Sequence, residues 1–291
     1  MVNYLLLFTS VFLDTFKNIY YNYFGKNMMQ GNRDTMFFNA VCCVGAVIYF
    51  ICRGADFNIS SYSMIMAVIF GVVTVGAQYF GLLSMGLGPM SYSVLFTYLS
   101  MLIPVVFGIV YYGNTPSWLQ IIGIVLMLVT FVLSCELKGE TKVSIKWLLA
   151  AFGSFLGWGI VGICQQLHQN SAYKDELTGF LLWTFIFSAI FFAILFAFSK
   201  KDKKDSQDSK PKTGIAALLL ILITGAAIGS INEINLYLSG AMNPVIFFPI
   251  VNVGVILLSG VAAIAVFREK LSMQQWIGLA TGFISILLLS I

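Results

Sequence analysis

The sequence predicts an all-α, polytopic membrane protein. Of its 291 residues, 59% are hydrophobic and only 10% are charged, whereas a soluble domain carries about 25% charged residues. The mean hydropathy is +0.91, so we expect lipid rather than water to surround most of the chain. Backbone groups in lipid must bond internally, so spanning segments must be helices or closed barrels. The apolar runs here are long and continuous, which favours helices.

Ten apolar runs predict ten transmembrane helices, because each run is close to the roughly 20 residues that cross a hydrocarbon core. The runs cover residues 2–24, 35–52, 64–85, 89–112, 118–135, 145–167, 177–199, 213–239, 244–267 and 272–291. The first run has no basic leader and no small-residue cleavage site, so we expect it to be a mature helix. Most connections are short. The exception is the charged segment 200–212, which we expect to be a solvated cytoplasmic loop.

The chain resembles two copies of one five-helix unit, residues 1–138 and 139–291. The segment 71–76 is similar to 225–230 at nearly the same offset, and residues 117–134 align with 272–290 without a gap through the first half. An odd number of spans per copy forces the two copies into opposite orientations. Inverted repeats of this kind are typical of secondary transporters, whose site lies between the repeats. The matched residues of the last helices are Ser117, Gln120 and Gly123 with Ser272, Gln275 and Gly278.

The basic residues predict the orientation of the chain. Loops after odd-numbered spans hold thirteen Lys and Arg residues, whereas the other loops hold only Arg53 and Lys174. The positive-inside rule therefore puts the basic loops in the cytoplasm and both termini outside. The net charge is only +4, and the five cysteines lack metal-ligand spacing with the single histidine, so we expect no cofactor, metal or nucleic-acid partner.

Three ionisable residues lie within the predicted spans, where insertion of a charge costs roughly 2.5–3.5 kcal/mol. Asp14 and Lys17 are three residues apart on the first helix and share a face. Desolvation would let Asp14 act as a proton or cation site. Alternatively, the two residues form an ion pair that neutralises both, or they hold the two charges of a zwitterion when they separate.

Glu233 has no cation in its own span, and we expect a cavity-facing carboxylate that couples protons or binds substrate. The alternative is a structural hydrogen-bond partner, with Lys17 as one candidate. His168 lies near a helix end, which favours an interfacial position. The glycine pairs 153/157, 225/229 and 278/282 are expected to pack helices within the chain. The other residues proposed to line the cavity are Asn232, Gln78, Tyr79, Gln165, Trp158, Tyr98 and Asn252.

Several of these segments resemble the EamA-like drug/metabolite transporter superfamily. Segments 118–123 and 267–278 are similar to the endings of that family's two repeats, and Gly157-Trp158-Gly159 is similar to its repeat-opening helix. Glu269 keeps the motif carboxylate, whereas Asn114 replaces it in the first repeat. The resemblance implies a ten-helix carrier with cytoplasmic termini, unlike the lysine count. Asp14 also matches the place of the carboxylate that binds protons and cationic drugs in small multidrug resistance relatives.

These observations predict a secondary active transporter that moves a small metabolite or drug across the cell membrane. It would work by alternating access with proton or solute coupling, as a monomer or homodimer. The alternative is a flippase, or a flippase subunit, for a lipid-linked carrier. An enzyme is not expected, because one histidine cannot supply an HExxH zinc site and only one aspartate is deep in a span. The chain has no GxxxxGK[ST] run for ATP.

Overall fold

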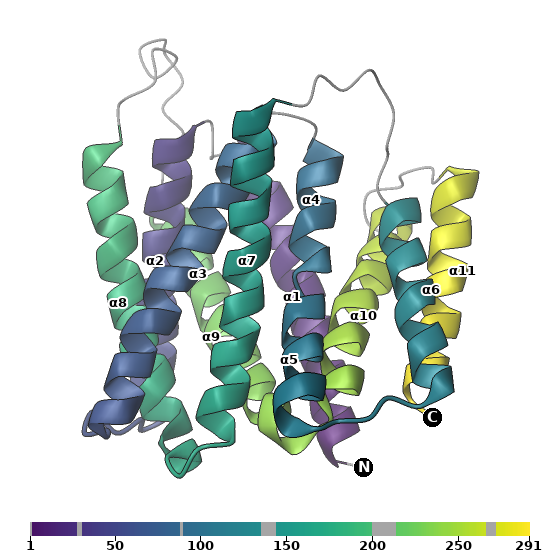
Figure 1. The fold of residues 1–291 in the computed structure, drawn as a ribbon. Coiled ribbons are helices and arrows are strands. Elements are labelled where there is room, and N and C mark those ends of the chain that lie inside the picture. Colours follow the sequence, from purple (N-terminus) through teal and green to yellow (C-terminus); the bar gives the residue numbers. More distant parts are fainter. Residues whose placement is uncertain (1, 28–30, 88–89, 135–143, 200–213, 266–271) are drawn as a thin grey trace. The chain divides into compact units, whose positions relative to one another are not determined.

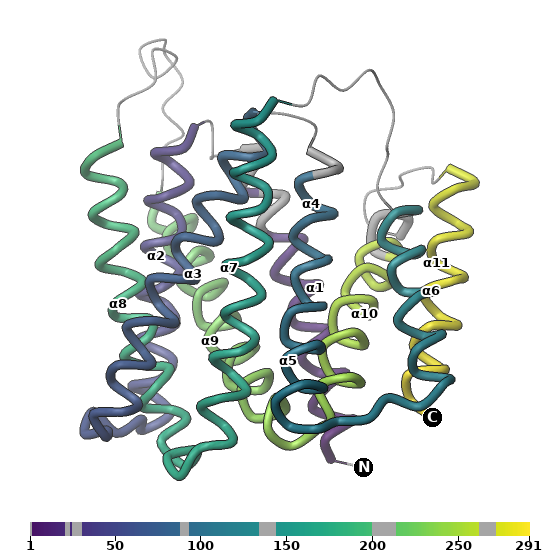
Figure 2. Tube along the Cα trace, in the orientation of Figure 1, coloured from purple at the N-terminus to yellow at the C-terminus, as the bar shows by residue number. Residues whose placement is uncertain are grey.

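The computed structural model describes residues 2–27, 31–87, 90–134, 144–199, 214–265 and 272–291 (Figure 1). Helices form almost all of these residues, and no strand occurs among them, which confirms the all-α prediction. The tube in Figure 2 follows the same helices along the chain. They are α1 (Val2–Asn27), α2 (Asn32–Cys52), α3 (Ser61–Leu87), α4 (Met90–Leu99), α5 (Leu102–Tyr112), α6 (Trp118–Ser134), α7 (Ile145–Gln169), the short η1 (Lys174–Glu176), α8 (Leu177–Phe198), α9 (Ile215–Ala241), α10 (Pro244–Ala265) and α11 (Met273–Leu289).

Seven segments of the described residues are long and apolar enough to cross a membrane. They are α2, α3, the joined α4–α5 segment, α7, η1 with α8, α9 and α10. Helices α6 and α11 are apolar but only 17 residues long. Helix α1 is longer at 26 residues but contains Asp14 and Lys17. The chain is therefore a multi-pass membrane protein.

The fourth predicted span is broken into α4 and α5. Pro104 has no N–H and cannot donate to the carbonyl of Ser100, so the backbone turns more tightly there. The N–H of Ile103 takes over that carbonyl at 3.1 Å, and the N–H of Met101 donates to Tyr98 at 3.4 Å. The break thus follows from Pro104, which lies inside an apolar run that hydropathy alone treats as one continuous helix.

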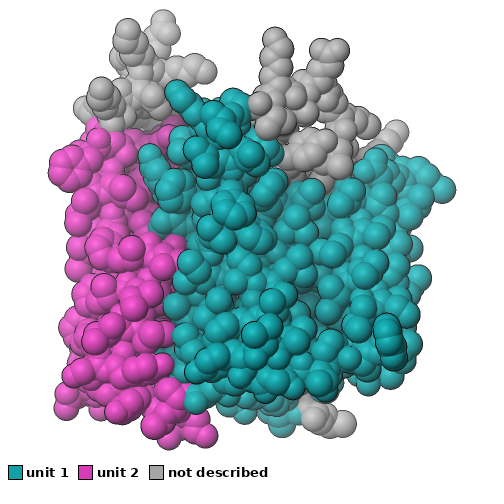
Figure 3. Space-filling model, viewed as in Figure 1, with its two compact units in different colours: residues 1–15, 76–170, 235–291 teal, residues 16–75, 171–234 magenta. Residues whose placement is uncertain are grey.

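The described helices form two compact units (Figure 3). Unit 1 contains Met1–Thr15, Gly76–Asn170 and Asn235–Ile291, and unit 2 contains Phe16–Val75 and Ser171–Ile234. Each unit therefore draws on both halves of the sequence, and α1, α3 and α9 each contribute to both. The predicted repeat boundary at 138/139, the loop 200–212 and Glu269 lie outside the described residues.

In unit 1, helices α6 and α11 pack antiparallel. The Thr130 and Thr281 hydroxyls are 3.0 Å apart, and the hydroxyl of Ser285 donates to the carbonyl of Gly123 at 2.8 Å. Gly123 precedes Thr130, whereas its partner Ser285 follows Thr281, so the two helices run in opposite directions. A Cβ on Gly123 would lie 2.9 Å from Leu289, so the missing side chain permits this close approach.

The same two helices begin with the same capping arrangement. The N–H of Ser117 donates to Gln120 Oε1 at 3.0 Å, and the N–H of Gln120 donates to the Ser117 hydroxyl at 3.2 Å. Ser272 and Gln275 make the same reciprocal bonds, at 2.9 and 3.3 Å. Each box satisfies two N–H groups that a helix start leaves unpaired. The sequence match between the two segments therefore has a structural counterpart.

In unit 2, α2 and α8 also pack antiparallel. The rings of Phe37 and Phe196 lie 5.7 Å apart, and those of Phe50 and Phe185 lie 5.9 Å apart. The first residue of each pair rises along α2 while the second falls along α8. Gly71 of α3 packs on α8 as well, and a Cβ there would lie 3.2 Å from the Thr184 carbonyl oxygen.

Candidate functional site

Helices α2 and α9 of unit 2 meet through glycine. A Cβ on Gly45 would collide with the backbone of Leu222, and a Cβ on Gly225 would collide with the backbone of Cys42. Only a missing side chain on each helix allows this approach. The predicted role of Gly225 in packing within the chain is therefore confirmed. The close crossing also fixes which side chains of α2 face α9 further along both helices.

One to two helical turns beyond this crossing, the two helices bring a carboxylate, a phenol and a guanidinium together. The Tyr49 hydroxyl donates to Glu233 Oε2 at 2.7 Å, and Arg53 Nη2 donates to Glu233 Oε1 at 2.9 Å. The Tyr49 ring lies against Gly229, whose added Cβ would be 3.0 Å from Tyr49 Cδ1. We call Tyr49, Arg53 and Glu233 the carboxylate cluster.

The two charged members of the carboxylate cluster differ in exposure. The Arg53 side chain is 57% exposed, whereas that of Glu233 is 16% exposed. Arg53 caps the C-terminal end of α2, where the helix dipole favours a cation. The hydrogen bond to Glu233, followed by its charge, raises the pKa of Arg53 above the ordinary arginine value. The guanidinium would lose its proton only as the pH rises through that raised pKa, so it stays charged at physiological pH.

The sequence identified Glu233 but missed Tyr49 and Arg53. Arg53 follows the last residue of an apolar run and looked like an ordinary loop residue. The cation that the structure places on Glu233 is Arg53, and not the Lys17 that the sequence named as one candidate. The spacing of Gly225, Gly229 and Glu233 was an available signal, because residues four apart share a helix face. That spacing puts the carboxylate in line with the packing glycines.

Asp14 and Lys17 lie on α1, one of the three helices whose residues are divided between the two units. Asp14 belongs to unit 1 and Lys17 to unit 2. Both side chains are half-buried, and the Oδ1 atom of Asp14 is buried. The proton-binding role of Asp14 and the ion pair with Lys17 both stay predictions.

Three of the other predicted cavity residues bond or pack locally. The amide of Asn232 donates to the carbonyl of Ile228 at 2.9 Å, and that of Asn252 donates to Phe248 at 2.8 Å, each within its own helix. The ring of Tyr98 lies 5.3 Å from that of Phe131. These contacts satisfy a donor or pack a ring, and a role of the same side chains toward substrate stays a prediction.

The remaining predicted residues belong to α3 and α7 of unit 1. Gln78 and Trp158 are half-buried, Tyr79 is exposed and Gln165 is buried. Gln165 is part of a polar end of α7 in which Gln166, His168 and Gln169 are also buried. The structure does not test whether these four predicted residues line a cavity.

The polar end of α7 makes a second close crossing, with the broken α4–α5 segment. A Cβ on Gly162 would lie 2.7 Å from the ring of Pro104, and Gln166 Nε2 donates to the Pro104 carbonyl at 2.8 Å. Gln166 is fully buried, and its backbone carbonyl accepts a hydrogen bond from the Tyr112 hydroxyl at 3.3 Å. His168 is fully buried as well. The sequence had favoured a position at the membrane interface, because the residue lies near the end of its helix.

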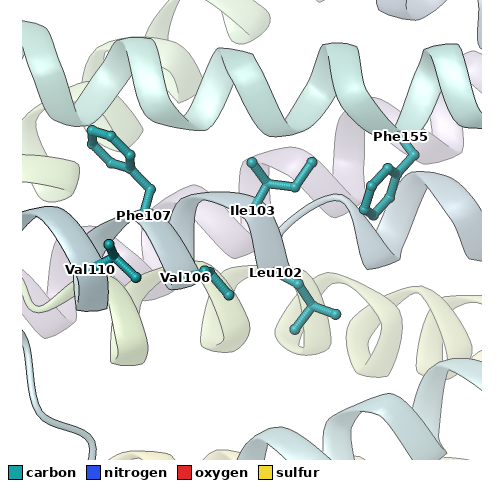
Figure 4. Close-up of a pocket in the computed structure, with 6 residues that line it drawn as sticks. All are labelled: Leu102, Ile103, Val106, Phe107, Val110 and Phe155. Atoms are coloured by element: carbon teal, nitrogen blue, oxygen red, sulfur yellow. The ribbon is translucent and has the colours of Figure 1, made fainter.

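An apolar hollow of about 490 Å³ lies along α5 (Figure 4). Five of its lining side chains come from successive turns of α5, and the sixth, Phe155, comes from α7. All the described side chains that line the hollow are apolar, so it is suited to apolar groups. The α5 residues are Leu102, Ile103, Val106, Phe107 and Val110.

Known proteins resemble this chain at the level of family and fold. An uncharacterized protein of Haemophilus influenzae is 25% identical over 189 residues, which cover 62% of this chain and 60% of that protein. One crystal structure superposes with a TM-score of 0.74 over 100% of this chain and 99% of its own, at 16% identity. At that identity the likeness shows the fold alone. The model of the EamA-like transporter family matches residues 145–291, which is just over half of the chain. The chain therefore belongs to the EamA-like transporter family.

Proposed function

We propose that this protein is a secondary active transporter that carries a small metabolite or drug by alternating access. Membership of a transporter family places it in a lipid bilayer with a small-molecule substrate. The carboxylate cluster is the observation that supports the finer proposal. A charge within a membrane helix is costly and marks a substrate or ion pathway by default. Glu233 lies in α9, a helix apolar enough to span the membrane. Its carboxylate accepts hydrogen bonds from Tyr49 and Arg53.

The proposal includes ten spans arranged as two inverted repeats. Helix α2 is the second span of one copy and α8 that of the other, and these two pack antiparallel. Helices α6 and α11, the last spans of the copies, also pack antiparallel. A two-fold axis in the membrane plane would pair equivalent helices in this way. Gly71 and Gly225 add support, because each packs on the second span of the other copy.

Glu233 is also our candidate for coupling to a proton or a counter-solute. Arg53 and Tyr49 each donate a hydrogen bond to one oxygen of this carboxylate. A conformation in which Arg53 moves away leaves Glu233, whose side chain is only 16% exposed, without its cation, so that a proton or another cation can take that place. Arg53 can make this move because most of its side chain is exposed. Opening and closing of this contact would tie charge at Glu233 to the conformation of the carrier.

Flux measurements on purified, reconstituted protein test the proposal. A thermal-shift screen of small solutes selects a ligand, and its uptake into proteoliposomes is then measured with and without a pH gradient. We expect Glu233→Gln to abolish the effect of the gradient and Asp14→Asn to weaken it. If both variants transport at the wild-type rate with the wild-type response to pH, the coupling assignment is wrong.

The sidedness of the loops needs a separate test. We propose cytoplasmic basic loops in the cell membrane, with both termini outside. A single cysteine at Ser206, in a variant without the five native cysteines, should react with an impermeant reagent only after the cells are opened. Reaction in intact cells would show that the proposed orientation is wrong and that the basic loops lie outside. The family match does not favour the alternative function, a flippase for a lipid-linked carrier.

A further inference from the structure

The contact between Arg53 and Glu233 uses only part of the hydrogen-bonding capacity of the Arg53 guanidinium. The guanidinium reaches the carboxylate through one nitrogen, Nη2, at 2.9 Å, whereas a fork-shaped pair would use two parallel hydrogen bonds. Arginine carries five N–H donors, and this side chain is 57% exposed. A second anion can therefore approach Arg53 from solvent.

Tyr49 gives the carboxylate a fixed orientation. Its hydroxyl holds Oε2 at 2.7 Å, and its ring is held against Gly229. When Arg53 leaves, Oε1 is the oxygen that loses its donor while Oε2 keeps one. The vacated position has the place and the charge preference of an N–H cation. Glu233 therefore offers a directed acceptor for an ammonium group.

The charge balance of the cluster selects among ligands. A purely anionic ligand that takes Arg53 leaves Glu233, only 16% exposed, without its cation, and a poorly solvated lone charge is unfavourable. A neutral ligand has nothing with which to separate the pair. A zwitterion replaces both partners at once: its carboxylate takes Arg53 and its ammonium takes Glu233. Every charge is then paired before and after binding.

We propose that the carboxylate cluster recognises a small zwitterion of the amino-acid type, with one ammonium and one carboxylate group. The inference rests on the proposed transport function and names the substrate class of that function. In the empty carrier, Arg53 and Glu233 neutralise each other in place of the ligand. The nearest rival is a purely cationic amine, because the displaced Arg53 can be hydrated where it is exposed. The experiment separates the two.

The test uses four derivatives that share one side chain and differ in the charges of their amino and carboxyl groups. Phenylalanine is the zwitterion, phenylalanine amide the cation, N-acetylphenylalanine the anion and N-acetylphenylalanine amide the neutral form; the same set is made from leucine. Thermal shifts of the purified full-length protein give an apparent affinity for each. One charge-assisted contact is worth about tenfold in affinity, so in at least one set we expect the zwitterion to bind wild type about tenfold more tightly than any other form.

Two variants should switch the charge preference in opposite directions. Arg53→Gln leaves a lone carboxylate, so the cation should become the best ligand. Glu233→Gln leaves a lone guanidinium, so the anion should become the best ligand. Arg33→Gln is the matched control, because Arg33 lies at the other end of α2, over the ring of Phe196, and its variant should keep the wild-type ranking. If Glu233→Gln does not fold, Glu233→Asp keeps the charge and should weaken all binding without changing the ranking.

Each outcome decides the proposal. It is overturned if none of the eight compounds shifts the wild-type protein, if wild type prefers the cation, or if Arg53→Gln keeps the wild-type ranking. The same compounds are then offered to proteoliposomes. Flux of another solute, without zwitterion binding, would overturn only the substrate class. Zwitterion binding that switches as expected, without flux of any compound, would overturn the transport function and leave the binding site standing.

Discussion

Two glycine-mediated helix crossings, one in each unit, end in polar contacts of opposite character. In unit 2, the crossing of α2 and α9 ends at Arg53 and Glu233, which are charged and partly exposed. In unit 1, the crossing of α7 with the α4–α5 segment ends at Gln166 and Pro104, which are neutral and buried. An exposed ion pair contributes little to stability, whereas a buried carbonyl that loses its donor is costly. We therefore propose that the first contact serves function and that the second serves folding.

The largest expected effect comes from filling the glycine positions. Gly225→Ala puts a methyl group onto the backbone of Cys42, whereas Gly162→Ala meets the ring of Pro104. The Cγ atom of a proline ring can shift slightly by a change of pucker, whereas the backbone of a packed helix cannot. Gly225→Ala should therefore lose the folded monodisperse protein, and Gly162→Ala should lower its stability by about 1–3 kcal/mol. Size-exclusion chromatography and melting curves measure both. Gly76→Ala is the control, because an added Cβ there meets nothing within 4 Å. If Gly76→Ala loses the folded protein as Gly225→Ala does, the close approach of α2 and α9 does not explain the loss.

The next effect concerns the neutral contact. Gln166→Leu removes the Nε2 donor to the buried Pro104 carbonyl, so we expect a loss of about 0.5–1.5 kcal/mol, the net contribution of one hydrogen bond. Melting curves in detergent report the loss. Because the contact has no charge, the ranking of ligands by charge should stay that of the wild type. A changed ranking would mean that unit 1 takes part in charge recognition.

The charged contact should show the reverse behaviour. Arg53→Gln should lower the melting temperature less than Gln166→Leu does, because the Arg53 side chain is mostly hydrated. The same variant should lose most of its transport at the substrate concentration that half-saturates the wild type. Parallel melting and flux measurements compare the two. Equal losses of stability in both variants would remove the distinction between a functional and a structural crossing.

The smallest expected effect is that of Tyr49→Phe. The ring that packs on Gly229 remains, and only the hydrogen bond to Glu233 Oε2 is lost. One such bond to a charged group contributes about 1.5–3 kcal/mol at most, and water can replace part of it at a partly exposed carboxylate. We expect a several-fold rise in KM with little change in the melting temperature. A loss as large as that of Arg53→Gln would give Tyr49 a direct role in binding.

The sequence alone determined the class of the protein and most of its helices. Too few charges for a soluble surface and long apolar runs led to an all-helical membrane protein, which the structure and the family match confirm. Local bonds were also readable, since Ser117–Gln120 and Ser272–Gln275 have the spacing of a capping box. Such features depend on residues close in sequence or on composition, so no tertiary information is needed.

Only the tertiary structure decided which charged and polar groups meet. Arg53 and Glu233 are 180 residues apart, and their contact depends on glycines that let α2 and α9 approach. The donor that Gln166 brings to Pro104 depends equally on a neighbouring helix. Hydropathy records how apolar a helix is and not which neighbour its faces meet. The sequence could therefore name Glu233 as a candidate carboxylate, while its partners Tyr49 and Arg53 emerged only from the packed helices.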